Sequence, residues 1–179
     1  MMRMKFFGIF TALLAVILGL GNLTESYGVE TGETQFLKNA RQLTYEGKRA
    51  GEGYFSKDGK AMIFQSEREP ENPFFQIYLL DFETGDTNRV SPGTGKTTCS
   101  FCRPGTNEAL FASTHLDPQA KAKQQAEIEF RATGKERRFT WDYDEHYDIF
   151  SAQRDGSKLK QLTNSTGYDA EGAYSPDAT

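Results

Sequence analysis

The stretch Glu52-Gly53-Tyr54-Phe55-Ser56-Lys57-Asp58-Gly59-Lys60 decides the fold, because it places an Asp-Gly pair between two apolar runs. Asp-Gly supplies the positive backbone angles that a two-residue hairpin turn requires. Tyr54-Phe55 before the turn and Met62-Ile63-Phe64 after it are therefore predicted to be paired antiparallel strands. Residues 76–80 are predicted to form a third strand, and residues 88–90 a more polar fourth.

The same pattern recurs along the chain, and self-similarity of this kind indicates a repeat architecture. The second occurrence consists of Cys99 to Gly105, Ala109 to Ser113 and Tyr147 to Ala152. The third consists of Leu162-Thr163 and Glu171 to Asp177. The third occurrence matches Leu43-Thr44 and Glu52 to Asp58 at one constant offset. Four short antiparallel strands in roughly 45 residues is the size of one propeller blade.

The order Leu-Thr, Phe-Ser-x-Asp-Gly-Lys, Ile-Phe-x-Ser-x-Arg and Ile-Tyr-x-x-Asp resembles the repeat of TolB-like β-propellers. The resemblance implies an all-β fold of four-stranded antiparallel blades, with blade 1 at about residues 40–91, blade 2 at about 92–160 and the start of a third at 161–179. It implies a binding scaffold rather than a reaction. The family includes the periplasmic Tol component, propellers attached to hydrolases, and many members of unassigned role.

The number of blades leads to a further expectation about the length of the protein. Propellers close with about four to eight blades, and two blades with the first turn of a third would leave sheet edges open. We therefore expect the sequence to be an N-terminal fragment of a longer propeller. A different reading is that the chain is the whole product and that its open edges pair between copies.

Residues 1–28 have the pattern of a secretory signal peptide. Arg3 and Lys5 precede an apolar run at 6–20, which is shorter than the roughly 20 residues of a spanning helix. Cleavage is predicted after Gly28, and no cysteine lies near that position to accept a lipid. The mature protein is expected to be periplasmic or secreted, with no stable membrane insertion after cleavage.

The charge of the chain argues against nucleic acid as a partner. The formal net charge is −4, and the predicted mature chain has no basic patch. No cofactor is predicted either, since Gly93 to Thr98 resembles a phosphate loop but has Val90 where that loop needs glycine. We interpret this segment as a polar connection between blades.

Cys99 and Cys102 have the spacing of a redox pair or of half a zinc site. The redox motif opens a helix and zinc needs two further ligands, and the sequence indicates neither. On an extended strand, residues three apart point to opposite faces with Cα atoms roughly 10 Å apart, beyond disulfide reach. We expect two small thiols that are buried or half-buried, although the turn at 103–105 could bring them closer together.

An insertion at about residues 115–146 separates the second and third strands of the second blade. Pro118 to Ala132 is rich in helix-forming residues and follows Asp117, a possible N-cap, so one short helix is predicted there. Aromatic and acidic residues then alternate from Trp141 to Asp148. Loops on a rigid scaffold are where binding residues concentrate.

The candidate partner-binding residues in this insertion are Trp141, Tyr143, Asp144 and His146. A structural interpretation competes with binding: the aromatic residues would pack, and the carboxylates would be solvated or paired with the basic cluster at 135–138. The sequence does not match a calcium-binding loop, because Tyr147 and Gln153 stand where such a loop needs glycine and glutamate. We predict no metal and no catalytic residue.

The sequence contains no nucleophile elbow and no His-Glu-x-x-His pair, and its two histidines are His115 and His146. We therefore predict an exported, non-catalytic β-propeller scaffold that binds a protein or polymer partner. The alternative is the N-terminal propeller portion of a longer exported hydrolase, a peptidase, whose catalytic domain lies beyond residue 179.

Overall fold

The computed structural model describes residues 32, 36–135, 137 and 143–178. The chain forms two compact units, Met1–Arg41 and Gln42–Thr179, and every element named below belongs to the second. The predicted signal peptide and its cleavage site lie outside the described residues. Within the described part of the chain, no helix has the length and apolar composition needed to cross a bilayer.

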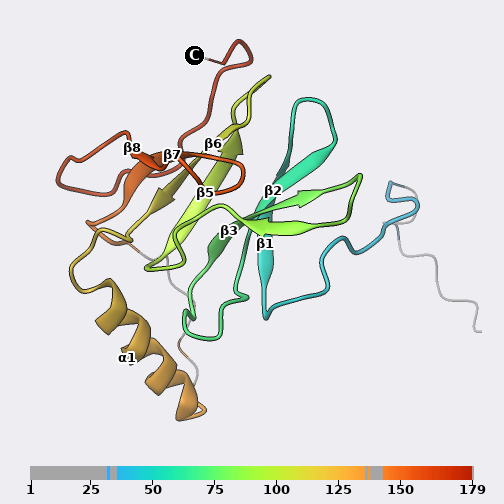
Figure 1. The fold of residues 1–179 in the computed structure, drawn as a ribbon. Helices are drawn as coiled ribbons and strands as arrows, with labels where there is room; N and C mark the ends of the chain where they lie inside the picture. The colour runs from blue at the N-terminus through green and yellow to red at the C-terminus, as the bar shows by residue number, and fades with distance from the viewer. Residues whose placement is uncertain (1–31, 33–35, 136, 138–142, 179) are drawn as a thin grey trace, which may run out of the picture. The chain divides into compact units, whose positions relative to one another are not determined.

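Two four-stranded antiparallel sheets make up the second unit, and the strands of each follow one another in chain order (Figure 1). The strands of the first sheet are β1 (Ala50–Phe55), β2 (Ala61–Ser66), β3 (Gln76–Asp81) and β4 (Thr87–Arg89). Those of the second are β5 (Thr97–Cys102), β6 (Glu108–Ser113), β7 (Asp148–Gln153) and β8 (Lys160–Gln161). Two consecutive meanders of this kind confirm the predicted all-β fold of two blades.

The hairpin of the first blade has the predicted pairing but a different turn. Tyr54 pairs with Ile63 across β1 and β2. The predicted two-residue turn is wrong, because five residues separate the strands and only Gly59 has a positive φ, of 69°. The Asp58 carboxylate accepts hydrogen bonds from Ser56 Oγ at 2.5 Å and from the Lys60 N–H at 3.1 Å. These bonds stabilise the longer loop.

The hydrophobic core lies between the two sheets. Ile63 and Ile77 of the first sheet pack against Phe111 and Phe150 of the second, and all four are almost completely buried. The two phenylalanine rings stack with centroids 6.3 Å apart. Face-to-face burial of this kind joins successive blades of a propeller, so the contact fixes the position of one blade against the next.

Each sheet is bulged at the same place in its first strand. The register shifts between Gly51 and Tyr54 in β1 and between Thr98 and Phe101 in β5. The equivalent residues of the three sequence blocks all have left-handed backbone: Glu52 (φ 43°), Cys99 (φ 52°) and Glu171 (φ 61°). Non-glycine residues adopt this conformation at a cost of about 1 kcal/mol each.

The bulge changes the expectation for the two cysteines. Cys99 is half-buried and Cys102 is buried, as expected, and both thiols are free. The strand is not the regular extended segment that the sequence suggested. Bulges commonly redirect a side chain at a sheet edge, and here the bulge residue is Cys99 itself.

The third sequence block begins as a segment packed on the second sheet. The Leu162 N–H donates to the Ile149 carbonyl at 2.8 Å. A Cβ atom at Gly172 would lie only 3.2 Å from Ile149 Cδ1 and 3.3 Å from Leu110 Cδ1. The close approach of this segment therefore favours glycine at position 172.

Candidate partner-binding site on the insertion

The insertion between β6 and β7 contains the predicted helix, α1 (Ala120–Ala132), which lies at one end of the strands (Figure 1). The predicted N-cap is wrong, since Gln119 holds that position and makes no side-chain cap hydrogen bond. Asp117 instead closes a turn ahead of the helix, where its Oδ1 accepts from the Gln119 N–H at 2.8 Å. Its carboxylate is thereby turned toward the rest of the insertion.

Buried amide side chains hold the connection between the blades against α1. Gln76 Oε1 accepts from Ser91 Oγ at 2.7 Å and from the Gly93 N–H at 3.0 Å. The Gly95 N–H donates to Gln124 Oε1 of α1 at 2.8 Å. The segment from Gly93 onward is therefore a connection between blades, as predicted, up to Thr97, where β5 begins.

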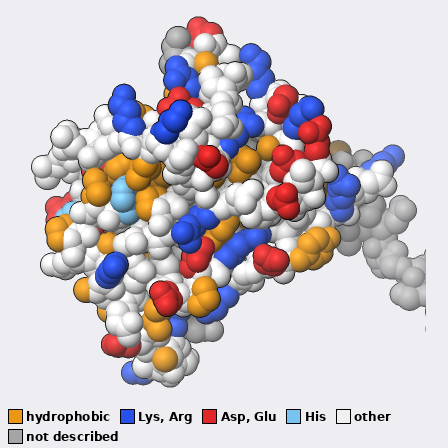
Figure 2. Space-filling model, viewed as in Figure 1, with side chains coloured by type: hydrophobic (Ala, Val, Ile, Leu, Met, Phe, Trp, Pro, Cys, Tyr) orange, Lys and Arg blue, Asp and Glu red, His pale blue; other side chains and the backbone are white. Residues whose placement is uncertain are grey.

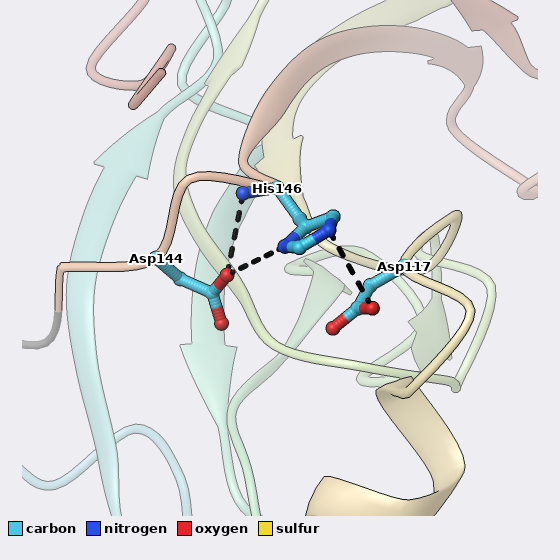
Figure 3. A group of neighbouring side chains, drawn as sticks. All are labelled: Asp117, Asp144 and His146. Atoms are coloured by element: carbon cyan, nitrogen blue, oxygen red, sulfur yellow. Dashed lines mark hydrogen bonds and ion pairs between the residues drawn. The ribbon is translucent and has the colours of Figure 1, made fainter. Parts of the chain in front are cut away.

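Two buried carboxylates, one histidine and two lysines form an ion-pair cluster at the base of the insertion. Figure 3 shows the carboxylates, Asp117 and Asp144, with His146. Lys123 Nζ lies 2.7 Å from Asp117 Oδ2 and 3.0 Å from Asp144 Oδ2, and Lys96 Nζ lies 3.3 Å from the same Asp144 oxygen. The Asp117 and Asp144 side chains are only 1% and 6% exposed. The His146 ring lies between them, with Nδ1 3.2 Å from Asp144 and Nε2 3.7 Å from Asp117.

The charges of the lysines decide the ionisation of the carboxylates. Burial alone would raise the pKa of Asp144, but the hydrogen bond from Lys123, the His146 N–H and the charge of Lys96 lower it to about 2. Burial likewise opposes ionisation of Asp117, and Lys123 with the Gln119 N–H lowers the pKa of that carboxyl. Both groups are therefore ionised at neutral pH.

The cluster has the donor atoms of a metal site, and its charges are also those of a structural ion-pair network. Asp117, Asp144 and His146 each offer an atom, and these atoms lie within 4.8 Å of one another. The two carboxylates already have Lys96 and Lys123 as counter-charges, so the cluster is balanced without a cation. Lys123 Nζ lies 2.7 Å from the buried Asp117 Oδ2, so this contact combines charge attraction with a short donor–acceptor distance.

Of the predicted site residues, Trp141 lies outside the described residues. Tyr143 is 58% exposed, and its ring stacks on that of Tyr168 with centroids 5.8 Å apart. Tyr147 is buried and meets the edge of the same Tyr168 ring at 5.3 Å. The structure thus brings Tyr143, Asp144 and His146 together on one short segment, with the tyrosine outward and the aspartate inward.

The structural interpretation of this segment agrees with the structure in one part and differs in another. Tyr147 is buried and Tyr143 packs on Tyr168, whereas the Asp144 carboxylate is buried and paired with Lys96 and Lys123. Arg137 pairs with Glu127 at 3.5 Å and lies 4.0 Å from the centroid of the Phe130 ring. Arg138 lies outside the described residues.

Sequence reasoning missed the two lysines that position Asp144, Lys96 and Lys123, and the second buried carboxylate of the cluster, Asp117. Asp117 was assigned to capping, and Lys123 is one of several lysines in a helical run with no local feature to distinguish it. A buried carboxylate needs a counter-charge, but the sequence gives no indication of which lysine supplies it.

A cavity of about 720 Å³ lies beside this cluster, bounded by both sheets and α1. Its lining includes aromatic rings with cations over them: Arg49 is 4.7 Å from the centroid of Phe75, and Lys96 is 5.5 Å from that of Phe74. On the face seen in Figure 2, basic and acidic side chains alternate and do not gather into a patch of one sign.

The paired four-stranded sheets, the inter-blade core and the bulged first strands define a β-propeller scaffold. No protein-family model matches the sequence, and no curated protein sequence does. Solved structures, in contrast, do match the fold. A candidate TolB from Agrobacterium tumefaciens covers 76% of this chain at a TM-score of 0.52 and 18% identity.

TolB from Acinetobacter baumannii covers 70% of the chain at a TM-score of 0.47 and 20% identity. The fold is that of a TolB-type propeller, which confirms the resemblance found in the repeats. The chain spans 42% of the length of the Agrobacterium protein and 24% of the Acinetobacter protein.

Proposed function

We propose that this protein is an exported, non-catalytic propeller scaffold that binds a protein or polymer partner through its insertion. The observation that carries the proposal is the arrangement of the segment at 143–146. Asp144 is held by Lys96 and Lys123 in a buried ion-pair cluster, while Tyr143 is directed outward. An exposed aromatic ring on a rigid base loses little conformational entropy on binding, and aromatic residues are enriched at binding hot spots.

Trp141 and His146 complete the proposed contact surface. His146 is partly exposed beside Tyr143, and Trp141 stands two positions earlier in the sequence. Charged side chains, among them Lys96 and Glu145, line the pocket around His146 and could contact a polar partner.

The binding proposal predicts a position-specific cross-link. A photo-reactive phenylalanine analogue in place of Tyr143 should form an adduct with the partner in intact cells, which mass spectrometry would identify. The same analogue at Tyr45, also an exposed tyrosine, is the matched control and should form none. Tyr143→Ala should weaken binding of the identified partner by about tenfold, the effect of losing about 1.4 kcal/mol of contact. Equal adducts at both positions would argue against a surface centred on Tyr143.

Export predicts a definite mature N-terminus. The protein isolated from the periplasm or medium should begin at Val29, as read by N-terminal sequencing, because the charged and apolar regions before it match a cleaved signal. Replacing Leu13 and Leu14 by arginine should keep the full-length chain in the cytoplasm. Recovery of unprocessed, membrane-embedded protein from the unmodified gene would contradict export with cleavage.

The alternative function, a propeller portion of a longer hydrolase, makes a different prediction about the gene. It requires a nucleophile elbow or a zinc-binding motif encoded downstream of residue 179. Peptidase activity of the complete gene product that is lost on replacing that nucleophile or ligand would favour the alternative over the scaffold.

A further inference from the structure

The two residues that follow each outer strand bind to the third strand of the same blade in one repeated arrangement. After β4, the Val90 N–H donates to the Ile77 carbonyl at 2.8 Å, and Ser91 Oγ accepts from the Ile77 N–H at 3.0 Å. After β8, the pair Leu162-Thr163 makes the same two bonds with Ile149, at 2.8 and 2.9 Å. An apolar residue followed by a hydroxyl residue therefore fastens the outer edge of each blade in this chain.

A third pair of this kind, Leu43-Thr44, stands before the first blade. It precedes the bulge of its block at the same spacing as the other two pairs, and residues 40–42 are in register with β4. Residues 40–44 nevertheless belong to no strand. Neither the Leu43 N–H nor the Thr44 hydroxyl forms a hydrogen bond with another residue in the described part of the chain. This segment therefore has the pattern of an outer strand but lacks the third strand that would bind it.

The first sheet has an apolar face in the position where a preceding blade would pack. The second sheet meets the first through five residues that share a core cluster with Ile63 and Ile77, namely Cys102, Ala109, Phe111, Phe150 and Ala152. The repeat spacing and the strand register give their equivalents in the first sheet, which are Phe55, Met62, Phe64, Tyr78 and Leu80. All five equivalents are apolar or aromatic, so the first sheet keeps the composition of a surface between blades.

Part of this face is open to solvent in the chain. Phe55 is 64% exposed, whereas its equivalent Cys102 is 4% exposed. Leu43 packs on the same face and is half-buried, whereas its equivalent Val90 is buried. The two rings at the centre of the face are buried, with the Arg68 guanidinium 5.2 and 5.1 Å from their centroids. The open apolar surface and the unpaired segment therefore lie together.

We propose that this face binds a further blade of the same protein, encoded beyond residue 179, and that residues 40–44 complete that blade as its outer strand. The third strand of the incoming blade binds the Leu43-Thr44 pair as Ile77 binds the pair after β4, through main-chain hydrogen bonds at a free sheet edge. A second copy of the described chain cannot supply this strand, because β3 is already paired with β4 and β7 with β8.

The length of the fold agrees with this occupant. Propellers close with about four to eight blades, and the chain spans 42% of the length of the Agrobacterium protein. The proposed contact joins the first blade to the last and closes the ring. It goes beyond the scaffold function proposed above and does not involve the Tyr143 surface.

Hydrogen exchange tests the pairing of residues 40–44 directly. The complete gene product is compared with the chain that ends at residue 179, by mass spectrometry of peptides that cover 40–44 and 87–91. The amides of 40–44 should exchange about a hundredfold more slowly in the complete product, because a paired strand exchanges only when it opens. Those of 87–91 are the internal control and should exchange at the same rate in both proteins, since β3 pairs with β4 in each.

A reciprocal pair of variants of the complete product tests the two hydroxyl groups. Thr44→Val keeps the shape of the side chain but removes the oxygen that accepts from the third strand. It should speed the exchange of 40–44 by about tenfold and leave that of 87–91 unchanged. Ser91→Ala removes the equivalent oxygen of the first blade and should have the opposite effect. Because both variants are made in the complete product, they test the proposal even if the shorter chain does not fold.

Several results would overturn the proposal. A reading frame that ends at residue 179 would remove the proposed occupant. Exchange of 40–44 that is equal in the complete product and the shorter chain, or that does not respond to Thr44→Val, would show that the segment is not a paired outer strand. Protection of 40–44 that rises with protein concentration would identify a second copy as the partner. None of these results bears on the cross-link expected at Tyr143, so the two proposals can fail separately.

Discussion

Replacing Phe111 by alanine is expected to lower the free energy of unfolding by about 3–5 kcal/mol, the usual cost of removing a buried phenylalanine ring. The Phe111 side chain is completely buried between the two sheets and stacks on Phe150 at 6.3 Å. Ile63 of the first sheet lies in the same cluster. The cavity left by the ring would therefore weaken the contact between the blades as well as the second sheet. Urea denaturation of the purified chain measures the change.

The matched control for this substitution is Phe55→Ala. Phe55 is also a phenylalanine on a strand, but it is 64% exposed and its ring contact is with Phe82 at 5.8 Å. Its loss should cost under about 1 kcal/mol. Equal costs for Phe55→Ala and Phe111→Ala would mean that the inter-blade core does not hold the sheets together.

The blade pattern could be predicted from the sequence because its signals are local. Alternation of apolar residues, an Asp-Gly turn and a repeated spacing are all present within one block of the chain. The type of turn could not be predicted, since it depends on whether the Asp58 side chain bonds to Ser56 and Lys60. Such a bond lets a longer loop satisfy its backbone without a positive φ at Asp58.

The candidate site was predictable only in part, because its partners are distant in the chain. The insertion, its helix and the candidate segment at 141–146 were visible as a break in the repeat. The counter-charges of Asp144 were not, since Lys96 and Lys123 reach it from the inter-blade connection and from α1. Proximity in sequence favoured the basic cluster at 135–138 instead, and Arg137 pairs with the helix.

The bulges show how a repeat can place dissimilar residues at equivalent positions. Aligning the blocks puts Glu52, Cys99 and Glu171 in register, yet none of them is the glycine or asparagine that usually marks a left-handed backbone. The sequence therefore identified the equivalence but not the conformation. The backbone cost repeats in all three blocks, which agrees with backbone strain being concentrated where side chains must be aimed.

Replacing Asp144 by asparagine is expected to destabilise the protein by about 2 kcal/mol at pH 7. The substitution keeps the shape but removes the charge that holds Lys96 and Lys123 at 3.3 and 3.0 Å. Breaking a fully buried ion pair costs more than this, but Lys123 is about one-third exposed and can turn toward water. The measurement is urea denaturation at pH 7, followed by the same titration at lower pH.

The pH dependence has a definite sign. The pKa of Asp144 is lowered from its ordinary value of 3.8 to about 2 in the folded protein, so protons bind more tightly to the unfolded chain. The ionised carboxylate therefore stabilises the fold above about pH 4, and this stabilisation is lost as the pH falls from about 4 to about 2. The difference in stability between the unmodified protein and Asp144→Asn should shrink over the same interval.

Asp155→Asn is the control, because its carboxylate is exposed and accepts hydrogen bonds from the neighbouring Ser157. The substitution should leave the free energy of unfolding at pH 7 nearly unchanged. A stability difference for Asp144→Asn that stays constant from pH 7 to pH 2 would contradict the ion-pair account, since a purely steric effect does not titrate. A difference that vanishes near pH 2 would identify the charge of Asp144 as what fixes the insertion to the scaffold.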